Sequence, residues 1–328
     1  NNEANLNEGE KAGVFWKFIK FSRFEYFLSF LKIYRLLKIN FIERDKNIII
    51  LYDGINLTNI LFAIISRIIG YRVFTDVVED YSVTQEKESF LRRALLLSNR
   101  VFEKYIFKFV KGVIVISESL KLKYQKGNVI NIPISAENLK CNYTKDKFEK
   151  YTYLYSGSFG VKDGIKILIN AFNIFSMNKE VQLLLSGKIT NEIENLIRDN
   201  EKIAYVGLIP EEEYYPFINK AHILLMTRID SNYANSGFPF KLGEYLASSN
   251  PVIATKVSDL GNYLSDKEDV IFAKPSDVES IVETLEFAYL NKSQVQKIGK
   301  KGKEVAKEHF NPEKNGVLLE QFLIKNYN

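Results

Sequence analysis

Short apolar runs rich in valine and isoleucine alternate with helical segments along the whole chain. Such runs occupy 47–52, 71–78, 112–117 and 128–134, and then 151–157, 180–187, 202–207, 222–226, 250–255 and 269–273. A strand that is buried on both faces reads as a continuous apolar run, whereas a half-exposed strand alternates apolar with polar residues. The alternation therefore predicts an α/β fold with doubly wound parallel sheets covered by helices on both faces.

The 328 residues are enough for two domains of about 150 residues each. The polar segment 135–150 is the predicted linker between an N-terminal domain, 1–134, and a C-terminal domain, 151–310. The remaining segment, 311–328, is expected to be a helix that could pack back on the first domain. Other helices are expected at 57–70, 89–111, 166–177, 212–221, 240–248 and 278–290.

Composition excludes several classes of protein. The 45 Lys and Arg residues exceed the 40 Asp and Glu residues by a formal charge of +5, which allows anionic ligands or a membrane surface without implying nucleic acid. The single cysteine, Cys141, excludes a disulfide framework and a cysteine-ligated zinc site, and indicates a reducing compartment such as the cytoplasm. The two histidines, His222 and His309, are too far apart in sequence for a metal-ligand motif.

A glycine-rich turn follows the run at 151–157. Glycines at 157, 160 and 164 leave backbone amides open at the start of the next predicted helix, an arrangement that can hold phosphate. An ordinary turn between a strand and a helix accounts for these glycines equally well.

The stretch 236–255 contains opposite charges at the start of a predicted helix. Gly237 and Pro239 suit the approach to a helix whose free amides attract an anion, and Lys241 adds positive charge at that end. Glu244, three residues further, offers a carboxylate to a pair of sugar hydroxyls. Arg228, directly after the run at 222–226, can reach an anion in the same cleft. The other interpretation is a surface arginine and an exposed ion pair between Lys241 and Glu244 worth about 0.3 kcal/mol.

Four segments in order resemble the donor half of retaining glycosyltransferases of family 4, which have the GT-B fold. They are YLYSGSFGVKDGIKILINAF, LLLSGK, IAYVGLIPEEEYYPFINKAHILLM and GFPFKLGEYLASSNPVIAT, and the resemblance covers about residues 112–325. It implies two Rossmann-like domains facing a cleft. It also implies a nucleotide-diphosphate sugar as co-substrate, with no permanently bound cofactor and no required metal ion.

The resemblance also implies roles for individual residues. Glu244 is expected to bind the ribose, and Arg228 and Lys241 are the expected diphosphate cations with a catalytic role. The remaining expected donor-binding residues are Gly157, Ser158, Gly160 and Lys162 in the turn, Val206, Gly207 and Leu208 beside the base, and Ser236, Gly237 and Phe238 before the helix.

Three positions depart from the family pattern. Ser236 stands where the family has the first of two glutamates, and the sequence fits a variant with Phe-Pro-x-Lys before Glu-Tyr. Ser158 stands where an arginine is expected. The first domain lacks the histidine expected near the sugar, and in FTDVVEDYS we assign that role to Glu79, although a solvated acidic loop is the simpler interpretation.

The beginning of the chain does not show the strand, glycine-rich loop and helix with which an acceptor domain starts, so the N-terminal domain is expected to be incomplete. Residues 11–40 instead read as helical, aromatic and basic. Such a segment can lie on the inner face of the cytoplasmic membrane, or it can pack its apolar side on the first sheet.

The predicted function is transfer of a sugar from a nucleotide donor to a glycan or lipid-linked acceptor, in the synthesis of cell-surface polysaccharide or lipid-linked glycan. Two alternatives remain open. One is a catalytically silent nucleotide-sugar-binding subunit, and the other is a sugar-nucleotide epimerase on the same fold. An epimerase usually needs histidines around the sugar, and the two histidines of this chain argue against it.

Overall fold

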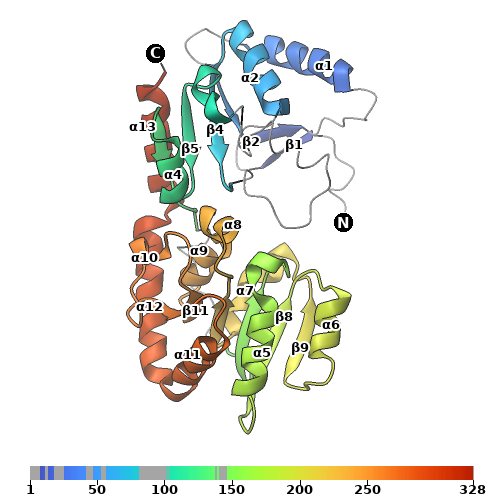
Figure 1. The fold of residues 1–328 in the computed structure, drawn as a ribbon, viewed down its shortest axis with the longest axis vertical. Coiled ribbons are helices and arrows are strands. Elements are labelled where there is room, and N and C mark those ends of the chain that lie inside the picture. Colours follow the sequence, from blue (N-terminus) through green and yellow to red (C-terminus); the bar gives the residue numbers. More distant parts are fainter. Residues whose placement is uncertain are drawn as a thin grey trace.

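The computed structural model describes residues 8–11, 14–17, 26–41, 47–52, 57–80, 101, 103–136, 139 and 146–327. Two parallel sheets, one above the other in Figure 1, form the framework of the molecule. Each strand of these two sheets lies within one of the apolar runs from which a strand was predicted. The predicted α/β fold class is therefore confirmed. The match arises because continuous Val- and Ile-rich runs are buried on both faces in such sheets.

The larger sheet has six parallel strands in the order β12-β11-β10-β7-β8-β9. Their bounds are β7 (Tyr151–Ser156), β8 (Val181–Ser186), β9 (Ile203–Gly207), β10 (Ile223–Met226), β11 (Val252–Thr255) and β12 (Ile271–Ala273). Successive residues of one strand enter different cores: Tyr153 belongs to the cluster under α5 (Ile165–Phe175) and α11 (Val278–Leu290), and Leu154 to the cluster under α7 (Glu211–Lys220) and α9 (Phe240–Ala247). Helices therefore cover both faces of this sheet.

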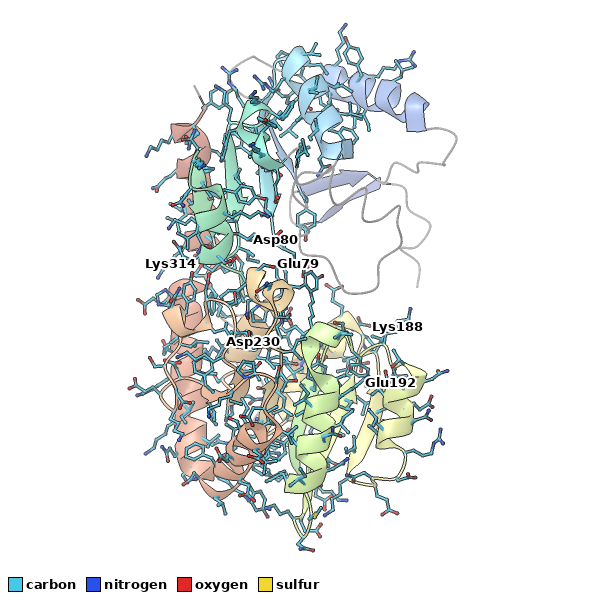
Figure 2. All side chains as sticks on the ribbon, viewed as in Figure 1. Glu79, Asp80, Lys188, Glu192, Asp230 and Lys314 are labelled. Atoms are coloured by element: carbon cyan, nitrogen blue, oxygen red, sulfur yellow. The ribbon has the colours of Figure 1, made fainter. Side chains whose placement is uncertain are left out.

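The smaller sheet has four parallel strands in the order β3-β4-β5-β6. These are β3 (Ile48–Leu51), β4 (Arg72–Val77), β5 (Gly112–Val115) and β6 (Val129–Asn131). The helices α2 (Leu57–Ile69) and α4 (Glu118–Tyr124) connect them. The carboxyl end of β4 points toward the larger sheet, and Figure 2 places Glu79 and Asp80 at this junction.

Strand order in the larger sheet reverses direction between β7 and β10. The chain proceeds from β7 outward through β8 and β9, then returns to β10 and proceeds the other way through β11 and β12. Parallel sheets bind ligands outside the carboxyl ends of the strands at such a reversal, because the two following loops diverge there. The loops after β7 and β10 thus locate the candidate site.

The end of the chain returns to the smaller sheet. In Figure 1, α12 (Lys292–His309) and α13 (Pro312–Lys325) run along one side of the molecule from the larger sheet to the smaller one. Phe322 of α13 packs on Phe74 of β4, with ring centroids 6.0 Å apart. The chain passes between the two sheets twice, once near Ala136 and once near Phe310. The two crossings are adjacent, since the amide of Ala136 donates to the carbonyl of Phe310 at 2.7 Å.

The helical prediction for residues 11–40 is wrong over part of its length. β1 (Glu8–Lys11) and β2 (Val14–Lys17) form an antiparallel pair, and helix α1 covers only Tyr26–Ile39. The run Val14-Phe15-Trp16 consists of β-branched and aromatic residues, which favour strands. The helix predicted over 89–111 lies mostly outside the described residues.

The short helices α6 (Asn191–Ile197), α8 (Asn232–Ser236) and α10 (Leu260–Tyr263), together with α4 and α12, were not predicted. Among the described residues, none of the helices has both the length and the apolar character needed to cross a bilayer.

Candidate functional site

Two adjacent cavities open at the reversal point. The smaller has a volume of about 190 Å³ and reaches from the end of β7 to Glu79, which follows β4. The larger is a groove of about 710 Å³ that extends toward the ends of β8 and β9. They share the lining residues Ser156, Gly157, Ser158, Phe240 and Lys241. The two cavities therefore adjoin at these residues.

The turn after β7 is fixed by the neighbouring strand. Gly157 donates its amide to the carbonyl of Ser186 at 2.8 Å. Gly187 has φ of +151°, and a Cβ at that position would lie 2.0 Å from the carbonyl oxygen of Gly157. The turn therefore lies close against the end of β8, and only glycine at position 187 permits this close contact. Gly157 and Ser158 of the turn line both cavities.

The turn also contains a buried acid. The hydroxyl of Ser158 is hydrogen-bonded to the carboxylate of Asp163, and Asp163 is only 9% exposed. Gly160 lies outside the cavity linings, and its carbonyl accepts from the amide of Asp163 at 3.0 Å. From the sequence, only its neighbour Lys162 was singled out.

Three cations line the smaller cavity, and two of them, Arg228 and Lys162, come from the loops after β10 and β7. Arg228 follows β10, where its amide donates to the hydroxyl of Thr255 at 2.7 Å and its guanidinium donates to the carbonyl of Ala234 at 3.3 Å. Burial lowers the pKa of Arg228, and Asp163 and Glu79 oppose that shift. An arginine pKa starts high enough for the guanidinium to stay charged. Lys162 is the second cation, from the turn after β7.

Glu79 carries a carboxylate from the smaller sheet into this cavity. It forms an ion pair with Lys162, and it accepts a hydrogen bond from the hydroxyl of Tyr233 at 2.7 Å. Burial works to raise the pKa of Glu79, but the hydrogen bonds from Lys162 and Tyr233, with the charges of Lys162 and Arg228, bring that pKa below its usual value. The carboxylate is therefore ionised at neutral pH.

Helix α9 supplies Lys241 and Glu244. Lys241 lines both cavities at the start of the helix and lies over the ring of Tyr214 at 5.9 Å. Burial lowers the pKa of Lys241, while Glu244 and Asp163 raise it. Glu244, one turn further, lines only the larger groove. Burial and the charges of Tyr245 and Glu244 raise the pKa of Tyr214, which keeps that phenol protonated beside the Glu244 carboxylate.

Two apolar residues from the loop after β9 line part of the larger groove. Leu208 follows β9 and is 75% exposed, next to Ile209 in the groove lining. The carbonyl of Gly207 accepts from the hydroxyl of Ser186 at 2.8 Å. Val206 is half-exposed on the strand but is not among the groove residues. An exposed apolar surface beside backbone groups suits a flat heterocycle.

The three predicted residues before α9 lie away from the cavities. Ser236 and Gly237 contact the segment after β4, and neither lines the two cavities. Phe238 is 1% exposed, and its ring packs edge-on against Tyr263 and Phe310 at 5.8 and 5.7 Å. Phe238 was expected among the donor-binding residues, and the structure places its side chain in the core at the junction of the two sheets.

Several site residues were missed from the sequence. Tyr245 bonds the end of β7, Tyr233 bonds Glu79, and Tyr155, Asp163 and Thr227 line the smaller cavity. Tyr245 directly follows Glu244 and would be found from the Glu-Tyr pair. Tyr233 carries no signal of this kind, because its partner is far away in sequence. In the described part of the chain, no group of three or more His, Cys, Asp or Glu side chains is placed to hold a metal ion.

The fold is that of GT-B glycosyltransferases. The structure superimposes on sucrose-phosphate synthase from Thermosynechococcus elongatus with a TM-score of 0.73 at 18% identity, covering 98% of this chain and 86% of that chain. It superimposes on Anabaena HepE in complex with UDP and glucose with a TM-score of 0.70 at 12% identity, covering 93% and 84%. A glycosyltransferase from Rickettsia africae gives a TM-score of 0.71 at 14% identity, covering 94% and 84%.

Comparison of the sequence with known protein families gives a more specific match for part of the chain. Residues 150–291, which include the turn after β7, Arg228, Lys241 and Glu244, match the family described as glycosyl transferases group 1. This part of the chain is therefore a glycosyl transferases group 1 domain. No curated protein sequence matches the chain significantly.

Proposed function

We propose that the protein is a glycosyltransferase that moves a sugar from a nucleotide-diphosphate donor to an acceptor hydroxyl, with retention of anomeric configuration. One observation carries this proposal: the distribution of chemical groups over the two adjacent cavities. The apolar Leu208 and the Glu244 carboxylate line only the larger groove, Gly157, Ser158 and Lys241 line both cavities, and Arg228 and the Glu79 carboxylate line only the smaller one. A nucleotide sugar likewise has its base and ribose diol at one end, its diphosphate in the middle and its sugar hydroxyls at the other end.

In the proposed reaction, the bond between the anomeric carbon and the diphosphate oxygen breaks, and a bond to the acceptor oxygen forms. Negative charge grows on the leaving diphosphate. In this scheme the cations Arg228 and Lys241, which line the smaller cavity, and the amides at the start of α9 stabilise the charge. Lys162 adds a further cation. These groups are sufficient for the scheme, which requires no metal ion.

The acceptor is proposed to be a glycan or a lipid-linked glycan at the inner face of the cytoplasmic membrane. Support comes from α1, which exposes Leu31 and Ile39, 51% and 80% accessible, together with Arg35 and Lys38. Apolar and basic side chains on one surface helix suit the interface of an anionic bilayer. Flotation with vesicles containing phosphatidylglycerol tests this: Leu31→Ser/Ile39→Ser should remain unbound, and an equal distribution of variant and wild type would contradict it.

The donor assignment is tested by thermal shift, since a ligand that binds the folded state raises the melting temperature. The probes are UDP, GDP, ADP and dTDP, each with its glucose, galactose, mannose and N-acetylglucosamine conjugates. UDP is the first choice because HepE is known in complex with UDP and glucose. One nucleotide series should raise the melting temperature. No shift with any of the probes would argue against a nucleotide-sugar site.

Product analysis then separates the alternatives. A transferase releases the nucleoside diphosphate in proportion to glycosylated acceptor. An epimerase converts the donor without any acceptor, and a silent subunit binds the donor without turnover.

A further inference from the structure

The two sheets are joined by a small polar contact between residues 78–80, after β4, and residues 236–237, before α9. We call these five residues the clasp. The amide of Asp80 donates to the hydroxyl of Ser236 at 3.2 Å, and that hydroxyl donates to the carbonyl of Tyr233 at 3.0 Å. The hydroxyl of Ser117, after β5, donates to the carbonyl of Ser236 at 2.6 Å. Ser236 thus bonds two separate segments of the smaller-sheet half.

Close packing accompanies these bonds. A Cβ added to Gly237 would lie 3.1 Å from the carbonyl oxygen of Val78 and 3.4 Å from Cγ of Glu79. The backbone at 237 therefore lies directly against the stem of the Glu79 side chain. Ser236 is 5% exposed, so water does not compete for its hydroxyl.

The clasp determines where the Glu79 carboxylate lies. With its backbone held between Val78 and Asp80, Glu79 extends into the smaller cavity to Lys162 and Tyr233, both from the other half of the molecule. The half-buried Tyr233 ring, whose pKa is raised to about 12 by burial and by Glu79, remains a hydrogen-bond donor at neutral pH. The carboxylate is consequently held on two sides, and Glu79 lines the cavity.

We infer that Ser236 and Gly237 are positioning residues that hold Glu79 in the cavity, where its carboxylate accepts hydrogen bonds from hydroxyls of the donor sugar. The inference rests on the proposed function. It assigns recognition of the two ends of the donor to different halves of the molecule: Glu244 to the ribose and Glu79 to the sugar. Binding of the sugar, but not of the nucleoside diphosphate, then requires the clasp.

A purely structural ion pair between the halves makes a different prediction. Breaking it would alter the melting temperature, and it would change the affinities for nucleoside diphosphate and nucleotide sugar by the same factor. The ratio of these two affinities is therefore the informative quantity, because a change in overall stability or in the nucleotide site cancels in it.

The test is calorimetric titration with the tightest-binding nucleotide sugar of the panel above and with its nucleoside diphosphate. Glu79→Gln should weaken binding of the nucleotide sugar about tenfold, as expected for losing a charged acceptor, and change the diphosphate affinity by less than about twofold. Ser236→Ala and Gly237→Ala should act in the same direction, and Ser236→Thr, which keeps the hydroxyl, should retain the wild-type ratio.

Glu192→Gln is the matched control. It makes the same chemical change in another ion pair between glutamate and lysine, with Lys166, on an exposed surface outside both cavities (Figure 2). The inference is overturned if Glu79→Gln leaves the ratio unchanged, or if Ser236→Ala, with Glu79 intact, has no effect. Binding of the nucleotide sugar by wild-type protein in those experiments leaves the proposed function standing. Absence of any wild-type binding would instead remove the proposed function and the inference with it.

Discussion

The hydroxyl of Tyr245 is bonded to both main-chain groups of Ser156. It donates to the Ser156 carbonyl at 3.0 Å and accepts from the Ser156 amide at 2.9 Å. Tyr245 lies on α9 and is 1% exposed, and Ser156 is the last residue of β7. The pair fixes the helix that carries Lys241 and Glu244 relative to the turn at Gly157. Because Ser156, Gly157 and Lys241 line both cavities, the geometry of both depends on one phenol.

Replacing Tyr245 by phenylalanine should therefore affect stability and binding together. The change leaves two buried main-chain groups without a partner, at a cost of about 2 kcal/mol in the free energy of unfolding. Urea denaturation measures this loss. Nucleoside diphosphate affinity should also fall several-fold by calorimetry. Wild-type affinity in a destabilised variant would show that α9 keeps its position without this bond.

Replacing Glu244 by alanine should weaken nucleotide binding by about 1–3 kcal/mol, the value of charged hydrogen bonds to a ribose diol. Calorimetry with the nucleoside diphosphate measures the effect. Glu212→Ala provides the control, since Glu212 is an exposed acid on α7 that is not in the groove lining. Equal affinity in Glu244→Ala and wild type, with the fold intact, would reject the ribose assignment.

Lys241→Ala should discriminate between ligands. The ammonium group lies where the two cavities meet, so its loss should reduce affinity for the nucleoside diphosphate at least tenfold. Affinity for the free nucleoside, which lacks the phosphates, should change by less than about threefold. If both ligands lose affinity equally, Lys241 supports the groove structurally through its contact with Tyr214.

His222 makes the stability of the larger-sheet half depend on pH. Burial, followed by the charges of Lys147 and Lys292, lowers its pKa from 6.5 to about 4, and its Nδ1 accepts the amide of Thr152 at 3.1 Å. The unfolded chain thus binds a proton between pH 6.5 and 4 that the folded chain does not. Its contribution is complete above pH 6.5 and declines as the pH falls to about 4.

The loss should reach about 1–2 kcal/mol, allowing for solvent screening of a half-buried ring. Urea denaturation at several pH values, with wild type and His222→Gln, measures it. The variant should lose this part of the pH dependence. Parallel curves for both proteins would show that other groups cause the decline.

The sequence predicted most of the fold and about a third of the residues that line the candidate site. Apolar runs located the strands, and the rule that ligands lie after parallel strands led to Gly157, Arg228 and Lys241. Residues whose position depends on distant segments could not be predicted equally well. Phe238 looks like part of a ligand-binding Gly-Phe-Pro, but its ring is buried against Phe310.

The environment of Glu79 could not be predicted from local patterning either. The sequence around it reads as a solvated acidic loop, and its environment is created by Lys162 and Tyr233, which are 83 and 154 residues away. The Val14–Lys17 strand was missed because aromatic residues and lysines in a short window fit a helix and a strand alike.

The paired crossings at Ala136 and Phe310 determine how the two halves can move. Two adjacent covalent connections between the halves favour rotation of one half relative to the other about the line that the connections define. They oppose twisting or sliding of the halves. Gly243 of α9 lies against this line, since a Cβ there would be 3.2 Å from Cβ of Ala136. Any swing of the smaller-sheet half therefore pivots beside the helix that carries Lys241 and Glu244, and it moves Glu79 relative to both of them.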